Sequence, residues 1–155
     1  MSGNALDTLR MREALRMARD AGARGEVPIG AVLASEEKVF ARAANATLHL
    51  NDPTAHAEIL ALRRGAKHLG NHRLTELTLY VTLEPCLMCL GAMIQARIAR
   101  CVFGAADPKV GATSVLTLPG VRRGVNHSFP IVGGCEALPA AELLQHFFRA
   151  RRVKR

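Results

Sequence analysis

The stretch that most restricts the fold runs from residue 77 to residue 105, where a strand, a helix and a second strand are predicted in succession. Residues 77–83, LTLYVTL, carry apolar side chains on both faces, as in a strand covered by helices on both sides. Pro85 favours a helix start, and this helix is expected to run to about Ala96. The strand RCVFGA follows at 100–105. A strand–helix–strand unit of this length joins two parallel strands, so the sequence predicts an α/β fold.

Two apolar runs upstream of this unit predict a hairpin that opens the sheet. Residues 27–34 are rich in β-branched side chains, and residues 38–45 follow after a polar turn. Residues 128–134, SFPIVGG, are predicted to form a short edge strand after a long surface loop over residues 107–126. The sequence therefore predicts a mixed sheet of about five strands.

Three further helices are predicted around the sheet. Residues 5–23 have apolar side chains along one helical face and arginines elsewhere. The Asp52-Pro53 pair combines a capping side chain with a proline suited to the first helical position, so a helix is predicted from there to about Lys67. The last helix is predicted over residues 139–152. Helices on both faces give a three-layer α/β/α architecture, in one domain over residues 1–155.

The charge of the chain favours a polyanionic partner. Lysine and arginine number 21 against 13 acidic residues, which gives a formal net charge of +8. A surface of this sign attracts phosphates, although charge alone is also compatible with a basic surface that binds nothing. Aromatic residues make up only 4% of the chain, so a platform of stacked bases is not expected. If nucleic acid binds, the protein is expected to contact one or two of its bases individually.

The chain is expected to stay in the cytoplasm. Charges are scattered through the N-terminal residues, which lack the apolar core of a secretory signal, and no apolar run reaches the length of a membrane span. Thiols remain reduced in the cytoplasm, so a disulfide framework is not expected. This applies to all four cysteines: Cys86, Cys89, Cys101 and Cys135.

A metal site is predicted at the start of the helix that follows Pro85. Cys86 and Cys89 are three residues apart, hence on one helical face, near an N-terminus whose dipole favours thiolates. Thiolates this close in a reducing compartment are natural zinc ligands, but two ligands do not fill a tetrahedral site. His56 lies near the start of the preceding helix and is predicted to supply a nitrogen. Three protein ligands would leave the fourth position for water, as in catalytic zinc sites.

Other interpretations stay open on the residues alone. A Cys-x-x-Cys pair also occurs in redox centres and structural zinc sites, and a fourth protein ligand would favour the latter. Candidates for that ligand are His49, Asp52 and Cys101. Glu58 favours catalysis, because a carboxylate two residues from a ligand can take a proton from a zinc-bound water. Its alternative role is that of an exposed glutamate placed favourably in the first turn of a helix.

The combination of His56-Ala57-Glu58 with Pro85-Cys86-Leu87-Met88-Cys89 resembles the signature of zinc-dependent nucleobase deaminases. Further segments are similar to the bacterial tRNA-specific adenosine deaminases of the TadA type, within the cytidine/deoxycytidylate deaminase superfamily, and cover nearly the whole chain. These segments are residues 26–33, Asn45, 51–63, 79–112, 124–127 and 147–152. The chain departs from the family at Ala106, where arginine is found, and at Thr47, where proline is common.

The resemblance implies a cytidine deaminase-like fold and a set of site residues. It makes His56, Cys86 and Cys89 the ligands of one zinc ion per subunit, and Glu58 the proton shuttle. It also implies a set of RNA contacts. Asn45 would touch the target base and Asp107 would lie near the RNA backbone, while the tRNA stem would be contacted by Arg149, Arg151 and Arg152.

The activity that the resemblance implies is hydrolytic deamination of adenosine to inosine at the wobble position of a tRNA anticodon. Zinc would activate a water, Glu58 would move its proton, and the anticodon stem-loop would bind a homodimer. One rival is a deaminase of free bases or nucleosides, which shares the metal motif but has no need of an arginine-rich tail. Another is a zinc-stabilised RNA-binding module without catalysis.

Overall fold

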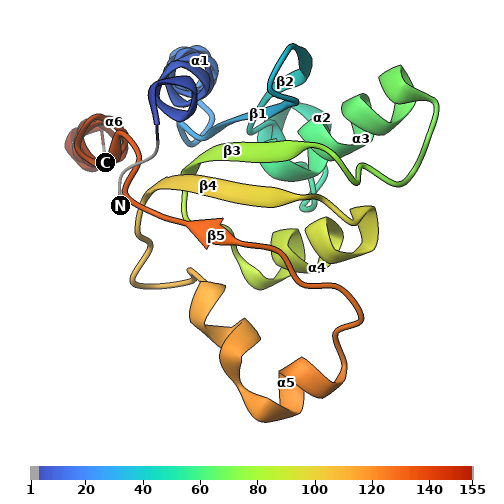
Figure 1. The fold of residues 1–155 in the computed structure, drawn as a ribbon. Coiled ribbons are helices and arrows are strands. Elements are labelled where there is room, and N and C mark those ends of the chain that lie inside the picture. The colour runs from blue at the N-terminus through green and yellow to red at the C-terminus, as the bar shows by residue number, and fades with distance from the viewer. Residues whose placement is uncertain (1–3, 155) are drawn as a thin grey trace.

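The structure is a computed structural model that describes residues 4–154, and its centre is a five-stranded sheet (Figure 1). The strand order is β2-β1-β3-β4-β5. Strand β1 runs antiparallel to both of its neighbours, whereas β3, β4 and β5 run parallel to one another. The strands span Gly30–Ala34 (β1), Val39–Ala44 (β2), Thr78–Leu83 (β3), Arg100–Ala105 (β4) and Ile131–Val132 (β5). The predicted mixed sheet, its opening hairpin and its parallel βαβ unit are confirmed.

Helices cover both faces of this sheet, so the predicted three-layer α/β/α class is also confirmed. The helices are α1 (Ala5–Ala23), α2 (Thr47–Leu50), α3 (Ala57–Leu69), α4 (Leu87–Ala96), the 3-10 helix η1 (Thr113–Thr117), α5 (Pro119–Arg123) and α6 (Ala137–Val153). No helix in the described part of the chain is long and apolar enough to cross a membrane. The ends of the predicted domain, residues 1–3 and 155, lie outside the described residues.

The side chains of β3 explain why the two layers of helices form. Leu79 and Val81 are fully buried in the core cluster that contains α3 and α4. Tyr80, which points the opposite way on a pleated strand, belongs to a second cluster with Met11 and Ala14 of α1. A strand that is apolar on both faces therefore requires a helical layer on each side, as the sequence of residues 77–83 indicates.

The predicted start of the helix at Asp52-Pro53 is wrong, because α3 begins four residues later, at Ala57. The Asp52 carboxylate accepts hydrogen bonds from the backbone N–H of Thr54 (2.8 Å) and from its hydroxyl (2.7 Å). It therefore stabilises a local turn rather than a helix N-terminus. Asn51 precedes this turn with a positive φ of 47°, at the end of the short helix α2.

Smaller differences concern the other helix boundaries. Helix α4 begins at Leu87 rather than at Pro85, and α6 begins at Ala137 rather than at residue 139. The predicted surface loop over residues 107–126 contains η1 and α5, the second of which has Pro119 in its first turn. Short helices of this kind lack the apolar periodicity that makes a longer helix recognisable in a sequence.

A buried polar cluster fastens α1 to the sheet. The Asp7 side chain is only 2% exposed and lies beside Arg100 of β4. Arg100 donates through Nη1 to Asp7 Oδ2 at 3.2 Å and through Nη2 to Oδ1. The Tyr80 hydroxyl of β3 donates to Asp7 Oδ1 at 3.0 Å. One carboxylate thus satisfies donors from two neighbouring strands and fixes the position of α1 over them.

We expect Asp7→Ala to lower the free energy of unfolding, because it leaves the Arg100 and Tyr80 donors without their buried acceptor. The loss should be about 2–3 kcal/mol, less than for a fully enclosed ion pair since Arg100 keeps contact with water. Urea unfolding measures it, with Asp20→Ala on the exposed face of the same helix as control. Equal stabilities of the two variants would contradict this account of the cluster.

Candidate metal centre and active site

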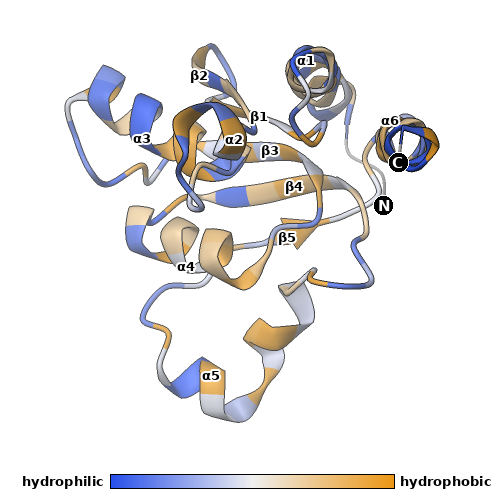
Figure 2. Cartoon of the chain, turned by 180° about the vertical axis from the view of Figure 1, so that it is seen from behind, coloured by the Kyte–Doolittle hydropathy of each residue, from blue (hydrophilic) through white to orange (hydrophobic). Residues whose placement is uncertain are grey.

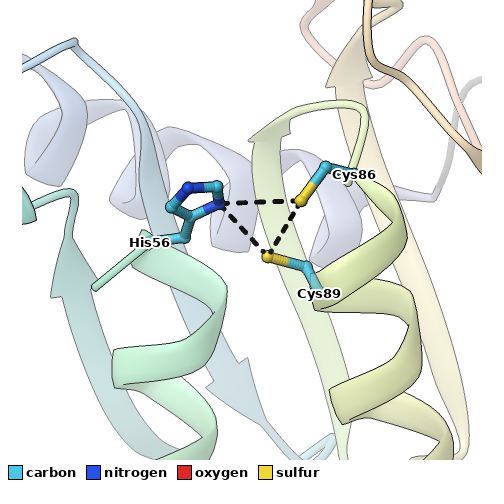
Figure 3. A group of neighbouring side chains, drawn as sticks. All are labelled: His56, Cys86 and Cys89. Carbon is cyan, nitrogen blue, oxygen red and sulfur yellow. Dashed lines mark hydrogen bonds between the residues drawn. The ribbon is translucent and has the colours of Figure 1, made fainter. Parts of the chain in front are cut away.

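The candidate metal ligands lie where two neighbouring helices begin. His56 is the N-cap residue of α3, and Cys86 is the N-cap residue of α4. Both have extended backbones, with φ and ψ of −71° and 152° for His56 and −78° and 173° for Cys86. Neither side chain caps its own helix, so both are free to point across the gap toward each other (Figure 3). Cys89, one turn into α4, completes the group.

The distances within this group fit a zinc ion. The two sulfur atoms are 3.7 Å apart, and His56 Nδ1 lies 3.7 Å from Cys86 Sγ and 3.5 Å from Cys89 Sγ. Tetrahedral zinc with ordinary Zn–S and Zn–N bonds requires about 3.8 Å between two sulfur ligands and about 3.6 Å between sulfur and nitrogen. The three donor atoms are therefore spaced as the corners of one zinc tetrahedron, and the group could hold a metal ion.

The three other candidates for a fourth ligand do not belong to the group of potential ligands. His49 Nδ1 lies 3.0 Å from a carboxylate oxygen of Glu26, and Asp52 is held in its turn by Thr54. Cys101 is fully buried in the hydrophobic core. Among the described residues, the cluster of potential ligands consists of His56, Cys86 and Cys89 alone. Three protein donors are typical of catalytic rather than structural zinc sites.

Glu58 lies beside the three candidate ligands. It occupies the first turn of α3, is buried, and has Oε2 4.0 Å from His56 Nδ1. Burial raises the pKa of this carboxyl to about 7, while a hydrogen bond with Cys89 opposes the rise. A carboxyl that titrates near neutrality can both accept and return a proton under cellular conditions. The alternative of an exposed surface glutamate is wrong.

Burial also affects the ligands themselves. It lowers the pKa of His56, which favours the neutral imidazole that a metal binds. Burial, followed by the charge of Glu58, raises the pKa of the Cys89 thiol. Without a metal ion, burial thus opposes the preference of the helix N-terminus for a thiolate at Cys89. A divalent cation supplies the missing attraction, because it deprotonates a coordinating thiol.

Asn45 is brought next to this centre. It follows β2 directly and is buried, with its side-chain amide 3.5 Å from the carbonyl oxygen of Val27. The next residue, Ala46, donates its N–H to the carbonyl of Ala55 at 3.1 Å. Ala55 immediately precedes His56, so Asn45 lies at the border of the candidate site.

The other predicted RNA contacts lie outside the group of ligands. Asp107 follows β4, and its carboxylate accepts from the N–H groups of Lys109 (2.9 Å) and Val110 (3.3 Å). The three arginines of the tail, Arg149, Arg151 and Arg152, are exposed on the last turns of α6. Arg151 donates to the carbonyl of Gly25 at 3.1 Å and lies over the ring of Phe147. The tail is thus anchored against the end of α1.

Two acids near the site, the buried Glu26 and the half-buried Glu84, were not identified as important from the sequence. Glu26 accepts hydrogen bonds from the N–H groups of Leu48 and His49, both at 3.0 Å. Glu84, which lies in the turn between β3 and α4, accepts hydrogen bonds from Asp107 and Thr113. In both cases the signal in the sequence was an acidic residue directly beside an apolar run that predicts a strand.

A three-layer α/β/α fold with His-x-Glu and Cys-x-x-Cys at two adjacent helix N-termini defines a nucleobase deaminase. The family model of MafB19-like deaminase matches residues 7–152. A tRNA-specific adenosine deaminase of Haemophilus influenzae is 44% identical over 150 residues, 96% of this chain and 87% of that protein. Another, from Agrobacterium fabrum, is 47% identical over 92% of this chain and 94% of that protein. The chain belongs to the tRNA-specific adenosine deaminases and is an enzyme.

A solved structure agrees with this placement. It comes from a study of A-to-I editing by tRNA:A34 deaminases at the wobble position of transfer RNA. It superposes with a TM-score of 0.83 at 45% sequence identity, covering 88% of this chain and 99% of that chain. Both the fold and most of the length of the chain are therefore shared with a tRNA deaminase.

We expect purified protein to contain one equivalent of zinc, measured by plasma emission spectroscopy. His56→Ala and Cys89→Ser should each lower zinc affinity at least about tenfold, because each removes one of three ligands held in tetrahedral spacing. His72→Ala, which changes an exposed histidine, serves as the control. Full zinc retention in both ligand variants would rule out this metal centre.

Proposed function

We propose that this protein is a zinc-dependent hydrolytic deaminase that converts adenosine to inosine at the wobble position of a tRNA anticodon. The observation that carries the proposal is the buried Glu58 carboxyl beside the tetrahedrally spaced His56, Cys86 and Cys89. The similarity to tRNA-specific adenosine deaminases over nearly the whole chain supports the choice of substrate.

The residues at the site would have two roles, metal binding and proton transfer. His56, Cys86 and Cys89 would hold one zinc ion per subunit, which supplies a water acidic enough to act as a nucleophile toward C6 of adenine. Glu58 accepts the proton of that water, because its pKa near neutrality matches the task. It would pass this proton to ring N1, then take the second proton from the hydroxyl group now attached to C6 and pass it to the departing amino group, so that the C6–N bond breaks, ammonia leaves and inosine remains.

The target base must leave its stack to reach Glu58, which is buried. A wobble adenosine is suited to this, because a loop base is easily splayed out. Asn45 is proposed to contact the flipped base, supported by the hydrogen bond that joins its neighbour Ala46 to Ala55, the residue before His56. The buried surroundings of Glu58 also limit the access of bulk water during the reaction.

The RNA itself is proposed to bind over the basic surface. Arg149, Arg151 and Arg152 carry three exposed charges on one helix end and are proposed to contact phosphates of the anticodon stem. Asp107 is proposed to lie near the RNA backbone from its turn after β4. A net charge of +8 supports a polymeric substrate over a free base, for which a wide basic surface has no use.

We further propose that the protein acts as a homodimer, as one domain over residues 1–155, in the cytoplasm where its tRNA substrate is found. Support for the dimer comes from α4, which is coloured hydrophobic along most of its length (Figure 2). Leu87 of α4 is 58% exposed and lines an open groove with Leu116 and Val121. Contact with a second copy would remove this apolar surface from water.

Replacing Glu58 tests the chemistry. We expect Glu58→Gln to reduce the rate of inosine formation on an anticodon stem-loop at least about 100-fold, since the amide cannot accept the proton. Zinc content and thermal stability should be retained, because the side chain keeps its size. Glu36→Gln, in the exposed turn of the hairpin, is the control. Wild-type activity in the Glu58 variant would refute the shuttle, whereas a zinc-loaded but inactive wild type would favour the noncatalytic zinc module.

Neutralising the tail tests the RNA surface. The Arg149, Arg151 and Arg152 to Gln triple variant should weaken binding of a stem-loop. It should also reduce the slope of log K against log salt by about 0.7–0.9 for each phosphate that the tail no longer neutralises. The control is a triple variant in which Lys38, Lys67 and Arg73 are replaced in the same way. It removes the same charge, but near the end of β3 that is remote from the metal site. Equal slopes in the two variants would favour a small substrate.

A further inference from the structure

We propose that Glu84 is a positioning residue for the RNA substrate: its carboxylate fixes residues 106–113, called here the 106–113 turn, at the border of the active site. The inference rests on the proposed function, because it concerns the same site and the same RNA. Glu84 lies between β3 and Cys86, and the 106–113 turn follows β4, the parallel neighbour of β3. The two segments therefore meet at the same edge of the sheet.

Three hydrogen bonds join Glu84 to both ends of the turn. Oε1 accepts from the backbone N–H of Asp107 at 3.1 Å. Oε2 accepts from the backbone N–H of Thr113 at 3.2 Å and from its hydroxyl at 2.7 Å. All three partners donate, so an ionised carboxylate matches them without a conflict. A glutamine in its place would direct an NH₂ group at one of these donors.

The turn is also packed directly on this carboxylate. A Cβ atom at Gly111 would lie 2.5 Å from Glu84 Cδ and 2.5 Å from the carbonyl oxygen of Asp107. The Gly111 N–H donates to that carbonyl at 3.0 Å, which closes the turn. Glycine is therefore required where the turn touches Glu84, because any side chain would push the two apart.

The turn reaches the metal centre through the neighbouring backbone. The N–H of Ala112 donates to the carbonyl of Pro85 at 3.0 Å, and the N–H of Glu84 donates to the carbonyl of Ala105 at 2.8 Å. The turn is thus attached to the two residues that immediately precede Cys86. It presents exposed residues at this border, among them Lys109 and Val110. A fixed turn here offers a preorganised surface to an incoming RNA loop, which lowers the ordering cost of binding.

The kinetic test compares two disruptions that act through different atoms. Glu84→Gln mismatches one donor, and Gly111→Ala pushes the turn off the carboxylate without removing any polar group. Both should raise KM for an anticodon stem-loop about tenfold or more, with kcat changed less than about threefold and zinc retained. Gly120→Ala, where an added Cβ meets nothing within 4 Å, is the matched control and should behave as wild type.

Thr113 provides a rescue experiment. Thr113→Val removes the hydroxyl that donates to Glu84 and should raise KM, whereas Thr113→Ser keeps this donor and should restore it. A kcat loss or zinc loss at unchanged KM would overturn the proposal, since Glu84 would then act on Cys86 rather than on the turn. An unchanged KM in both Glu84→Gln and Gly111→Ala would overturn it as well.

Amide hydrogen exchange tests the contact separately from the activity. In Glu84→Gln at least one of the amides of Asp107 and Thr113, the one that faces the new NH₂ group, should exchange faster, while the amides of β3 and β4 keep their protection. Unchanged exchange rates at both amides would show that the Glu84 carboxylate does not fix the turn. A wild-type protein that converts no adenosine would instead refute the proposed function, so the two failures are distinguishable.

Discussion

The structure depends on the side-by-side packing of α3 and α4 on one face of the sheet, because this brings their N-termini together. Leu60 and Ala61 of α3 share a core cluster with Leu90 and Met93 of α4. The packing is apolar and nondirectional, yet it brings His56 Nδ1 to 3.7 Å from Cys86 Sγ and to 3.5 Å from Cys89 Sγ. A displacement of either helix by about 1 Å would spoil that spacing, so the centre depends on the buried core cluster beneath it.

The segments on two sides of the centre are held in the same way, by a carboxylate that accepts backbone N–H groups. On one side, the buried carboxylate of Glu26 accepts the N–H groups of Leu48 and His49. On the other, Glu84 accepts those of Asp107 and Thr113. These N–H groups, in the first turn of α2 and in the segment after β4, lie outside the sheet and lack ladder partners, and an acceptor-only side chain satisfies two of them at once. The packed helices position the ligands, and the carboxylates of Glu26 and Glu84 position the segments around them.

The sequence predicted the sheet and the Cys86–Cys89 pair because both depend on local patterns. His56, 30 residues from Cys86, was added because it also lies near the start of a helix. The doubly apolar strand at 77–83 requires two helical layers, and Cys86 and Cys89 must share a helical face. The roles of Glu26 and Glu84 were not predictable in this way, since each depends on partners more than 20 residues distant. The raised pKa of Cys89 likewise depends on burial and on Glu58, neither of which follows from its position in the helix.

The misplaced helix start at Asp52-Pro53 affects the chemistry as well as the boundary. If the helix began at Pro53, His56 would stand at its fourth position, inside regular α-helix, where side chains tilt back along the preceding turn. The turn held by Asp52 delays the helix to Ala57 and makes His56 the N-cap, whose extended backbone aims the ring at α4. The same shift moves Glu58 into the first turn, close enough to His56 to serve the same centre. A capping motif used for a turn instead of a helix thus sets the geometry of the ligand and the carboxyl together.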